Sequence, residues 1–342
     1  MVQENLAGSQ GTPRPDEILG MANSFWMSAI LKAGIELDVF SEIAVGNDTV
    51  EKMTSSIKAS ERGVRILLDA LCAIGIISKA EGKYLLTPAA DQFLVKGKDS
   101  YMGYAAFTIL RDWEALGRIA EAVRKGSLIV DAYGADSEVW EDVAIGLTPS
   151  GFATASLIGD VLGIGAKMEP GVKVLDLACG SGVYGYVLLQ RDPKATVTDI
   201  DWGNVLKVAQ KAARDMGVAD RVIYKPGDML SIDYGEEEFD IAIVSNILQA
   251  FDPETNKMIL SKICKALKPG GTVVIHDIVP DEERSQAIRA LIFAVYMLLV
   301  STGGDAYTLS EFESWLGDTG FENVTTHGVP GGTTLIMATK KY

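Results

Sequence analysis

The chain has 342 residues, of which 48% are hydrophobic and 23% are charged. This length and composition allow two globular domains with buried cores, so global disorder is excluded. The formal net charge is −15, which repels nucleic-acid phosphates and anionic lipid surfaces at long range. We therefore expect neither a nucleic acid nor a membrane as a partner.

Cysteine usage and the N-terminus bear on the compartment. Cys72, Cys179 and Cys264 are far apart and form no CxxC pair, so they predict neither a disulfide framework nor a zinc site, and we expect no metal. Residues 1–15 are polar and lack the basic start and apolar core of a signal peptide. The sequence predicts a disordered tail on a cytoplasmic protein.

Residues 16–97 carry the pattern of short helices that end in a small hairpin. Pro15 can occupy the first turn of one helix, and Ser60 can cap another. Two short strands, 76–78 and 84–86, follow and are joined by a tight turn. Helices and a small hairpin in this order predict a winged helix.

The pattern in residues 98–165 predicts further helices with large aromatic side chains. Aromatic residues at helical spacing usually belong to a core, and some line a pocket. An arginine that reaches a pocket can clamp a carboxylate with two hydrogen bonds, although most helical arginines face solvent. The candidate substrate-binding residues, here and on a later helix, are Phe107, Arg111, Trp113, Phe152, Tyr296 and Met297.

From residue 166 onward, strands alternate with helices. The predicted strands are 172–177, 195–200, 221–225, 239–245 and 272–277, with a closing pair at 322–326 and 334–339. Strands separated by helices predict an α/β fold, a parallel, doubly wound, Rossmann-like sheet that binds ligands beyond the strand C-termini.

A glycine-rich loop follows the first of these strands. In the segment from Asp176 to Gly185, small residues let the backbone approach a ligand at a helix N-terminus. Gly180, Gly182 and Gly185 match G-x-G-x-x-G, which also suits NAD. Two acidic residues, Asp199 and Asp201, end the next strand, where a carboxylate can accept hydrogen bonds from both ribose hydroxyls of either cofactor.

Three features favour S-adenosylmethionine over NAD. Asp176 can receive the ammonium of an amino-acid moiety but would repel a pyrophosphate. Asp228 offers an acceptor for an adenine amine, with Met229 beside it, and residues 268–271 predict a tight turn before the fifth strand. We therefore predict an S-adenosylmethionine-dependent methyltransferase. An NAD-dependent dehydrogenase, a non-methylating cofactor-binding relative and a binding or regulatory protein are the alternatives.

On these residues the chain resembles the class I small-molecule methyltransferases of the caffeate, acetylserotonin and hydroxyneurosporene O-methyltransferase type. The resemblance covers nearly the whole chain and includes residues 201–206, DWGNVL, which are similar to the family's DLPxVL. It implies a winged-helix dimerisation domain at 16–97, a helical connector lining the substrate pocket at 98–165, and a catalytic domain at 166–342. A homodimer is implied as well. A DNA-binding wing is the alternative, which the net charge disfavours.

The resemblance also implies a cofactor site. Its members are Asp176, Gly180 and Gly182 at the methionine end, Asp201 at the ribose, Trp202, Asp228 and Met229 around adenine, and Ser245 on the fourth strand.

The chain departs from this family where the proton is removed. Gln249 stands where O-methylating members carry a histidine, and an amide can orient a substrate but cannot accept a proton at neutral pH. A supporting acid is lost at Ala306, whereas the acid after the fifth strand is kept as Asp277. We therefore expect an acceptor that needs little base catalysis, which is sulfur, carbon or an acidic oxygen. Conventional O-methylation of a hydroxylated aromatic by another base is the alternative.

His276 is the candidate for such a relocated base. It precedes Asp277, and alternation along a strand turns it toward the opposite face of the sheet. A buried, hydrogen-bonded histidine is the alternative interpretation, so the accepting atom and the base stay open.

Overall fold

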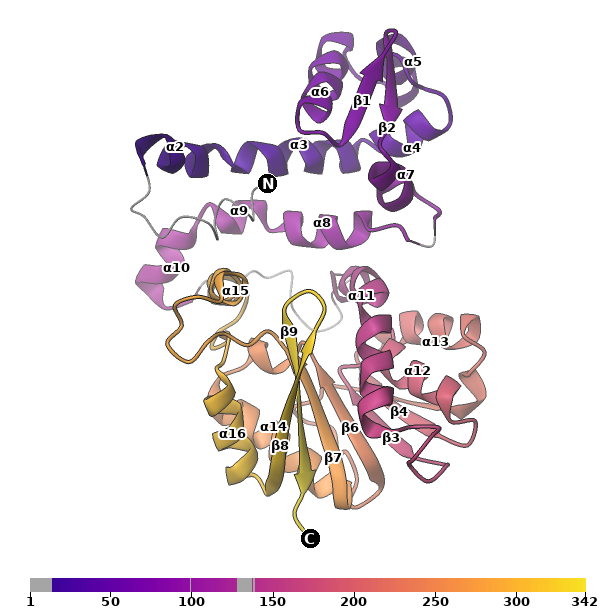
Figure 1. The fold of residues 1–342 in the computed structure, drawn as a ribbon, viewed down its shortest axis with the longest axis vertical. Coiled ribbons are helices and arrows are strands. Elements are labelled where there is room, and N and C mark those ends of the chain that lie inside the picture. The colour runs from indigo at the N-terminus through magenta and orange to yellow at the C-terminus, as the bar shows by residue number, and fades with distance from the viewer. Residues whose placement is uncertain (1–13, 99, 128–136, 138) are drawn as a thin grey trace. The chain divides into compact units, whose positions relative to one another are not determined.

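The computed structural model describes residues 14–98, 100–127, 137 and 139–342, apart from the side chains of 107–109 (Figure 1). The predicted disordered tail lies almost wholly outside the described residues. The chain divides into two compact units, residues 1–111 and 112–342.

The first unit consists of short helices and one hairpin. Its elements are α2 (Pro15–Asn23), α3 (Phe25–Glu36), α4 (Val39–Ala44), α5 (Val50–Ile57), α6 (Glu61–Ala73), β1 (Ile77–Ala80), β2 (Lys83–Leu86), α7 (Pro88–Leu94) and α8 (Gly103–Arg111). The N-terminal helix is interrupted at Ser24. The Ser60 hydroxyl accepts a hydrogen bond from the Gly63 N–H at 3.1 Å, as expected for a helix cap.

The first unit extends beyond the boundary expected at residue 97. Helix α8 packs against α3, so it belongs to the same compact unit as the hairpin. The core of this unit is formed by buried side chains such as Phe40, Met53, Leu68 and Tyr84.

Helices α2 and α3 leave a stripe of apolar side chains exposed. Its members are Ile18, Leu19, Met21, Phe25, Trp26 and Met27. The ranges Pro15–Glu36 and Val139–Leu162 are long and apolar enough to cross a membrane by length and composition alone. Helices that bury an apolar face against protein also meet this criterion.

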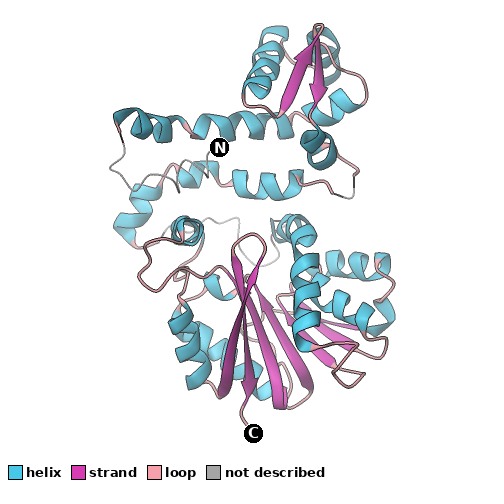
Figure 2. Cartoon of the chain, viewed as in Figure 1, coloured by secondary structure: helices cyan, strands magenta, loops and turns pink. Residues whose placement is uncertain are grey.

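The second unit is an α/β sandwich with strands in the centre (Figure 2). Its helices are α9 (Trp113–Leu116), α10 (Ile119–Lys125), α11 (Val139–Leu162), α12 (Val183–Arg191), α13 (Val205–Asp215), α14 (Pro253–Ala266), α15 (Ile288–Val300) and α16 (Leu309–Asp318), with 3-10 turns η2 (Ala219–Arg221) and η3 (Leu248–Ala250). Its strands are β3 (Lys173–Leu177), β4 (Thr196–Asp201), β5 (Val222–Pro226), β6 (Phe239–Ser245), β7 (Leu267–Asp277), β8 (Phe321–Val329) and β9 (Thr333–Lys340).

The sheet order is β5-β4-β3-β6-β7-β9-β8. The first five strands in this order, β5, β4, β3, β6 and β7, are parallel. Strand β9 runs antiparallel to both β7 and β8. The chain leaves β3 toward β4 on one side and later returns to place β6 on the other side. The carboxyl ends of β3 and β6 therefore form the switch point at which α/β sheets bind ligands. The predicted doubly wound sheet and its closing hairpin are confirmed.

The two faces of the sheet have separate cores. Side chains of α14 and α16 pack with Val273 and Ile275 of β7, whereas side chains of α11, α12 and α13 pack on the other face, with Val274. Alternation continues to the end of β7, so His276 belongs to the α12 face and Asp277 to the α14 face.

Two local predictions differ from the structure. Residues 268–271 lie inside β7, where the pairing with β6 shifts register, and do not form a turn before it. Helix α15 begins at Ile288 and not near residue 283, because the Asp281 carboxylate accepts hydrogen bonds from the backbone N–H groups of residues 285–287. These bonds hold the backbone in a loop before the helix begins.

Candidate active site

The loop after β3 brings two carboxylates against its own backbone. Asp176 is buried and accepts a hydrogen bond from the Gly185 N–H at 3.2 Å. The Gly180 N–H donates to Oδ2 of Asp201 at 2.8 Å. Ala178 adopts a left-handed φ of 52° between them, which is rare for a residue with a Cβ and is frequent at functional sites. The loop thus turns tightly at the carboxyl ends of β3 and β4.

Three carboxyl groups gather beneath this loop. Asp176 pairs in register with Asp199, and Asp201 follows on the same strand. Burial raises the pKa of Asp199 to about 7 and that of Asp201 to about 6. Burial, and then the charge of Asp199, raise the pKa of Asp176 well above its ordinary value. Such a cluster favours a cationic ligand, because a positive charge stabilises the ionised carboxylates.

Asp199 occupies the most enclosed position of the three. Its Oδ2 accepts the Tyr186 hydroxyl at 2.6 Å, while its Oδ1 is buried with no hydrogen-bond partner among the described residues. Tyr186 is itself fully buried. The sequence indicated this carboxylate only as a neighbour of Asp201, because its burial depends on helix α12 folding back over β4.

Replacing Asp199 with asparagine is expected to flatten the dependence of stability on pH. A carboxyl whose folded-state pKa is raised binds its proton more tightly in the folded chain, so the free energy of unfolding falls as the pH rises from about 4 to 7. A tenfold difference in proton affinity between the folded and the unfolded chain corresponds to about 1.4 kcal/mol in the free energy of unfolding. Urea denaturation at pH 5 and 7.5 measures this loss.

The exposed substitution Asp318→Asn is the matched control. It should leave the pH dependence of the wild type unchanged. An Asp199→Asn variant that loses as much stability between pH 5 and 7.5 as the wild type would contradict the assignment of a raised pKa to Asp199.

The predicted adenine residues lie close to Asp201, the carboxylate predicted to bind the ribose. The Trp202 N–H donates to Oδ1 of Asp201 at 2.7 Å, and the Gly227 N–H donates to the Asp201 carbonyl at 3.0 Å. Asp228 accepts a hydrogen bond from the Leu230 N–H at 2.8 Å, and Met229 is buried. The ends of β4 and β5 therefore come together around Asp201.

His276 is enclosed in a hydrogen-bond network on the α12 face. Its Nδ1 lies 3.0 Å from the Ser245 hydroxyl and 3.1 Å from the Tyr184 hydroxyl, and its Nε2 lies 2.8 Å from the hydroxyl of Thr333. Burial lowers the pKa of His276 to about 4, so the imidazole is neutral at physiological pH. The sequence had no signal for the Tyr184 contact beyond a tyrosine within the glycine motif.

Gln249 lies in η3, immediately after β6. Its side-chain Nε2 donates to the Asn246 carbonyl at 3.3 Å, and its backbone carbonyl oxygen accepts the Asp305 N–H at 3.0 Å. The side-chain Oε1 is buried without a hydrogen-bond partner in the described part of the chain. Asn246 adopts a left-handed φ of 55°, which marks this turn as a second strained backbone position at the switch point.

Asp277 lies beside Gln249, at the end of β7. Its Oδ1 accepts the Ile278 N–H at 2.8 Å, and its Oδ2 is buried with no partner among the residues described. Burial raises the pKa of Asp277 to about 7, although the N–H groups of Ile278 and Gln249 lower it. Ala306, where the resemblance expects an acid, packs against Ile278. The three positions that the resemblance associates with proton removal are thus neighbours.

The predicted substrate-binding residues are divided between the two units. Helices α9 and α15, which carry Trp113 and Tyr296, are in contact, and the Tyr296 hydroxyl donates to the buried Asp112 carboxylate at 2.6 Å. Met297 is buried, whereas Phe152 on α11 is exposed. Arg111 and Phe107 belong to α8 of the first unit, and the side chain of Phe107 lies outside the described residues.

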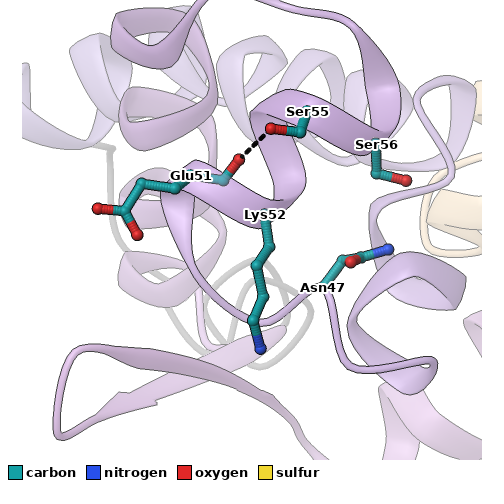
Figure 3. Close-up of a pocket in the computed structure, with 5 residues that line it drawn as sticks. All are labelled: Asn47, Glu51, Lys52, Ser55 and Ser56. Atoms are coloured by element: carbon teal, nitrogen blue, oxygen red, sulfur yellow. Dashed lines mark hydrogen bonds between the residues drawn. The ribbon is translucent and has the colours of Figure 1, made fainter.

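A surface hollow of about 570 Å³ lies in the first unit (Figure 3). It is lined by Asn47, Glu51, Lys52, Ser55 and Ser56. These side chains are polar, and Ser55 and Lys52 bond to the protein itself, to the Glu51 carbonyl and the Asp48 carboxylate. The hollow contains none of the predicted site residues, so we do not assign it to the reaction.

Comparison with known proteins decides the family. A model of a methyltransferase domain matches residues 168–312, and a model of an O-methyltransferase dimerisation domain matches residues 19–96. A solved structure from Nostoc punctiforme, described as that of an O-methyltransferase, is 32% identical, with coverage of 96% of this chain and 100% of that chain and a TM-score of 0.86. The chain belongs to the O-methyltransferase family.

Relatives of known name agree with this membership. The tetracenomycin polyketide synthesis 8-O-methyltransferase TcmO of Streptomyces glaucescens is 29% identical, over 95% of this chain and 97% of the relative. The 3-hydroxy-5-methyl-1-naphthoate 3-O-methyltransferase of Streptomyces sahachiroi is 27% identical, over 98% and 99%. Human N-acetylserotonin methyltransferase, solved with S-adenosylmethionine, shares the fold at a TM-score of 0.81, with 20% identity and coverage of 98% and 100%.

The methyltransferase hypothesis is therefore confirmed. The enzyme is an S-adenosylmethionine-dependent O-methyltransferase of small molecules with an N-terminal dimerisation domain. The dehydrogenase and non-enzymatic alternatives are wrong.

Proposed function

We propose that the enzyme methylates an acidic phenolic hydroxyl of a small aromatic molecule without a histidine base. The observation that carries this proposal is Gln249, a half-buried side chain with a buried amide oxygen at the position where the resemblance expects the base. An amide accepts and donates hydrogen bonds but does not take up a proton at neutral pH. A hydroxyl that ionises readily suits such a site best.

The cofactor would be held at the switch point. S-adenosylmethionine supplies an electrophilic methyl group on a positively charged sulfur. Asp176 and the glycine loop suit its amino-acid end, Asp201 its ribose, and Trp202 with residues 228–229 its adenine, while Ser245 lines the site. The buried carboxyl cluster and its unpartnered Asp199 oxygen suit a cation, which supports this assignment.

Replacing Asp201 with asparagine is expected to weaken the binding of S-adenosylhomocysteine by about 1.5 to 3 kcal/mol, because hydrogen bonds to a charged group are lost. Titration calorimetry measures the change, with NADH as the competing ligand class. The exposed variant Asp215→Asn should bind like the wild type. Unchanged binding in Asp201→Asn, or binding of NADH by the wild type, would contradict this assignment.

The relatives support an aromatic oxygen as the acceptor. TcmO is named for O-methylation in the synthesis of a polyketide, tetracenomycin, and the naphthoate methyltransferase for O-methylation of a hydroxylated naphthoate, which is an aromatic acid. The L-tyrosine C(3)-methyltransferase of Streptomyces lavendulae, 29% identical over about half of each chain, is named for transfer to carbon. We favour oxygen, because TcmO and the naphthoate methyltransferase match over 97% and 99% of their own length, whereas the tyrosine methyltransferase matches over about half.

The position of the new methyl group tests this choice. The enzyme is incubated with S-adenosylmethionine labelled with ¹³C at the methyl group and with hydroxylated naphthoates, anthraquinones and simple phenols. We expect methoxy signals in the NMR spectrum, strongest for acceptors whose hydroxyl ionises near neutral pH. Methyl signals on a ring carbon or on sulfur would contradict the proposal.

Replacing Gln249 with alanine is expected to lower kcat/KM by about 5- to 30-fold, since one or two neutral hydrogen bonds to the acceptor are lost, at about 1 to 2 kcal/mol. Steady-state kinetics with the best phenol measures it. Gln92→Ala, at an exposed position of the first unit, is the control. A loss above about 1000-fold would indicate that Gln249 does more than orient the acceptor.

We also infer that the enzyme is a homodimer. The match to the dimerisation domain spans residues 19–96, and the exposed apolar stripe of α2 and α3 lies largely within it. Apolar patches of this kind usually mark an interface.

A further inference from the structure

We propose that Asp277 accepts the proton of the phenolic hydroxyl during methyl transfer. The inference rests on the proposed function, since it concerns the fate of that proton. The resemblance gives this role to a histidine. In this chain Gln249 stands at the position of that histidine, and we assign the role to a carboxylate instead.

The placement of Asp277 carries this inference. Strands β6 and β7 are adjacent and parallel, and Ser245 pairs with His276, so Asp277 is level with the start of the turn that holds Gln249. The Oδ1 atom accepts the Ile278 N–H, the Gln249 backbone N–H also lies close enough to the carboxyl group to lower its pKa, and Oδ2 is buried without a hydrogen-bond partner among the described residues. A buried acceptor that lacks a donor is costly in a folded protein. A hydroxyl group of a bound acceptor would supply the missing donor.

Gln249 completes the arrangement. Its Nε2 uses one hydrogen on the Asn246 carbonyl and retains a second, and its Oε1 is buried without a described partner. An amide with unused hydrogen-bonding capacity can hold the acceptor oxygen while the hydroxyl hydrogen points at a neighbouring carboxylate. In this arrangement Gln249 orients the acceptor and Asp277 takes up its proton.

The surroundings make Asp277 a weak base of suitable strength. Thr334 is its partner on β9, His276 precedes it as a neutral ring, and η3 presents Gln249. The nearby charged groups bond elsewhere: Asp281 to the backbone that follows it, and Arg284 to Asp305 and Glu311. Burial raises the pKa of Asp277 to about 7. Proton transfer is most effective when the base titrates near the working pH.

The proposed step balances. The O–H bond breaks and its proton goes to Oδ2 of Asp277, the oxygen electron pair forms the bond to the methyl carbon, and the carbon–sulfur bond breaks with its pair left on sulfur. Asp277 then releases its proton to solvent after the product leaves. No further reactant is needed.

His276 does not compete for this role. Both of its ring nitrogens contact hydroxyl groups of the protein, and it lies on the α12 face of the sheet, opposite Asp277. Substitution of His276 therefore serves as the comparison in the test.

The test is kcat against pH between 5 and 9 for the wild type, Asp277→Asn, His276→Asn and the exposed Asp318→Asn, with two phenols of different acidity. The wild type should show a limb near pH 7 that does not move with the acceptor. We expect Asp277→Asn to lose this limb and to turn over about 100-fold more slowly, which is at the low end of the contribution of a general base. The deficit should shrink for the more acidic phenol. The limb should persist in the other two variants.

Several results would overturn the inference. One is a limb that persists in Asp277→Asn, and another is a deficit equal for both phenols, which a structural role would produce. If Asp277→Asn does not bind S-adenosylhomocysteine in calorimetry, the dependence of the wild-type kcat on pH tests the inference instead. A limb whose pH follows the acidity of the phenol would overturn the inference, because it would mean that the phenol ionises in solution. If the wild type methylates no phenol at any pH, the proposed function fails and this inference with it.

Discussion

Replacing Gly182 with alanine is expected to abolish measurable binding of S-adenosylhomocysteine and to lower the free energy of unfolding by about 2 to 5 kcal/mol. Gly182 has a φ of 73°, and an added Cβ would lie 2.2 Å from the Tyr186 ring. That ring cannot move easily, because it is fully buried and its hydroxyl bonds to Asp199 and to the Ala209 carbonyl. The substitution is therefore expected both to strain the loop and to displace the carboxyl cluster of Asp176, Asp199 and Asp201.

Gly180→Ala is the matched control for Gly182→Ala. Gly180 has a similar φ of 57°, but the nearest atom to its added Cβ is the side chain of Ala144 at an ordinary 3.7 Å. Only the backbone strain of about 1 to 2 kcal/mol remains. Urea denaturation and calorimetry compare the two variants. Equal losses of stability in both variants would show that the buried Tyr186 ring moves aside at little energetic cost, which would contradict this prediction.

Replacing Trp26 with aspartate is expected to convert the protein to a monomer at micromolar concentration and to remove most of its activity. Trp26 is 60% exposed and has the largest side chain among the exposed apolar residues of α2 and α3. A tryptophan at the core of an interface contributes about 2 to 4 kcal/mol to association, and a charge in its place must also be desolvated. The dissociation constant should rise about 100-fold or more. Light scattering after size exclusion measures the mass.

Leu85→Asp provides the control for Trp26→Asp. Leu85 is also an exposed apolar residue of the first unit, at 44%, but it lies on the hairpin and not on the stripe. This variant should remain a dimer. A wild type that is monomeric, or a Trp26→Asp variant that stays dimeric, would contradict the proposed interface.

The sheet and its glycine loop could be predicted because their signals are local. Alternating strands and helices and the spacing from Asp176 to Gly185 each determine short-range geometry that neighbours in sequence enforce. The start of α15 could not be predicted, because it depends on one carboxylate, Asp281, binding three successive backbone groups. The helix propensities of the residues in this segment do not indicate such a loop.

The electrostatics of the site depend on tertiary packing. The sequence marks Asp199, Asp201 and Asp277 as acids near strand ends, but the raised pKa of each results from the burial that helices and loops impose. Strand alternation correctly separated His276 from Asp277. Only the structure shows that the histidine is enclosed while the aspartate retains an unpartnered oxygen.

The absence of a histidine base is the central claim, and kcat of Gln249→His relative to the wild type at pH 7.5, with the best phenolic acceptor, tests it most directly. We expect the histidine variant to be no faster than the wild type, within about threefold, because the acceptor ionises readily and a base is already present. A general base that the reaction lacked would contribute roughly 10²- to 10⁴-fold when restored. An acceleration of tenfold or more in Gln249→His would contradict the account.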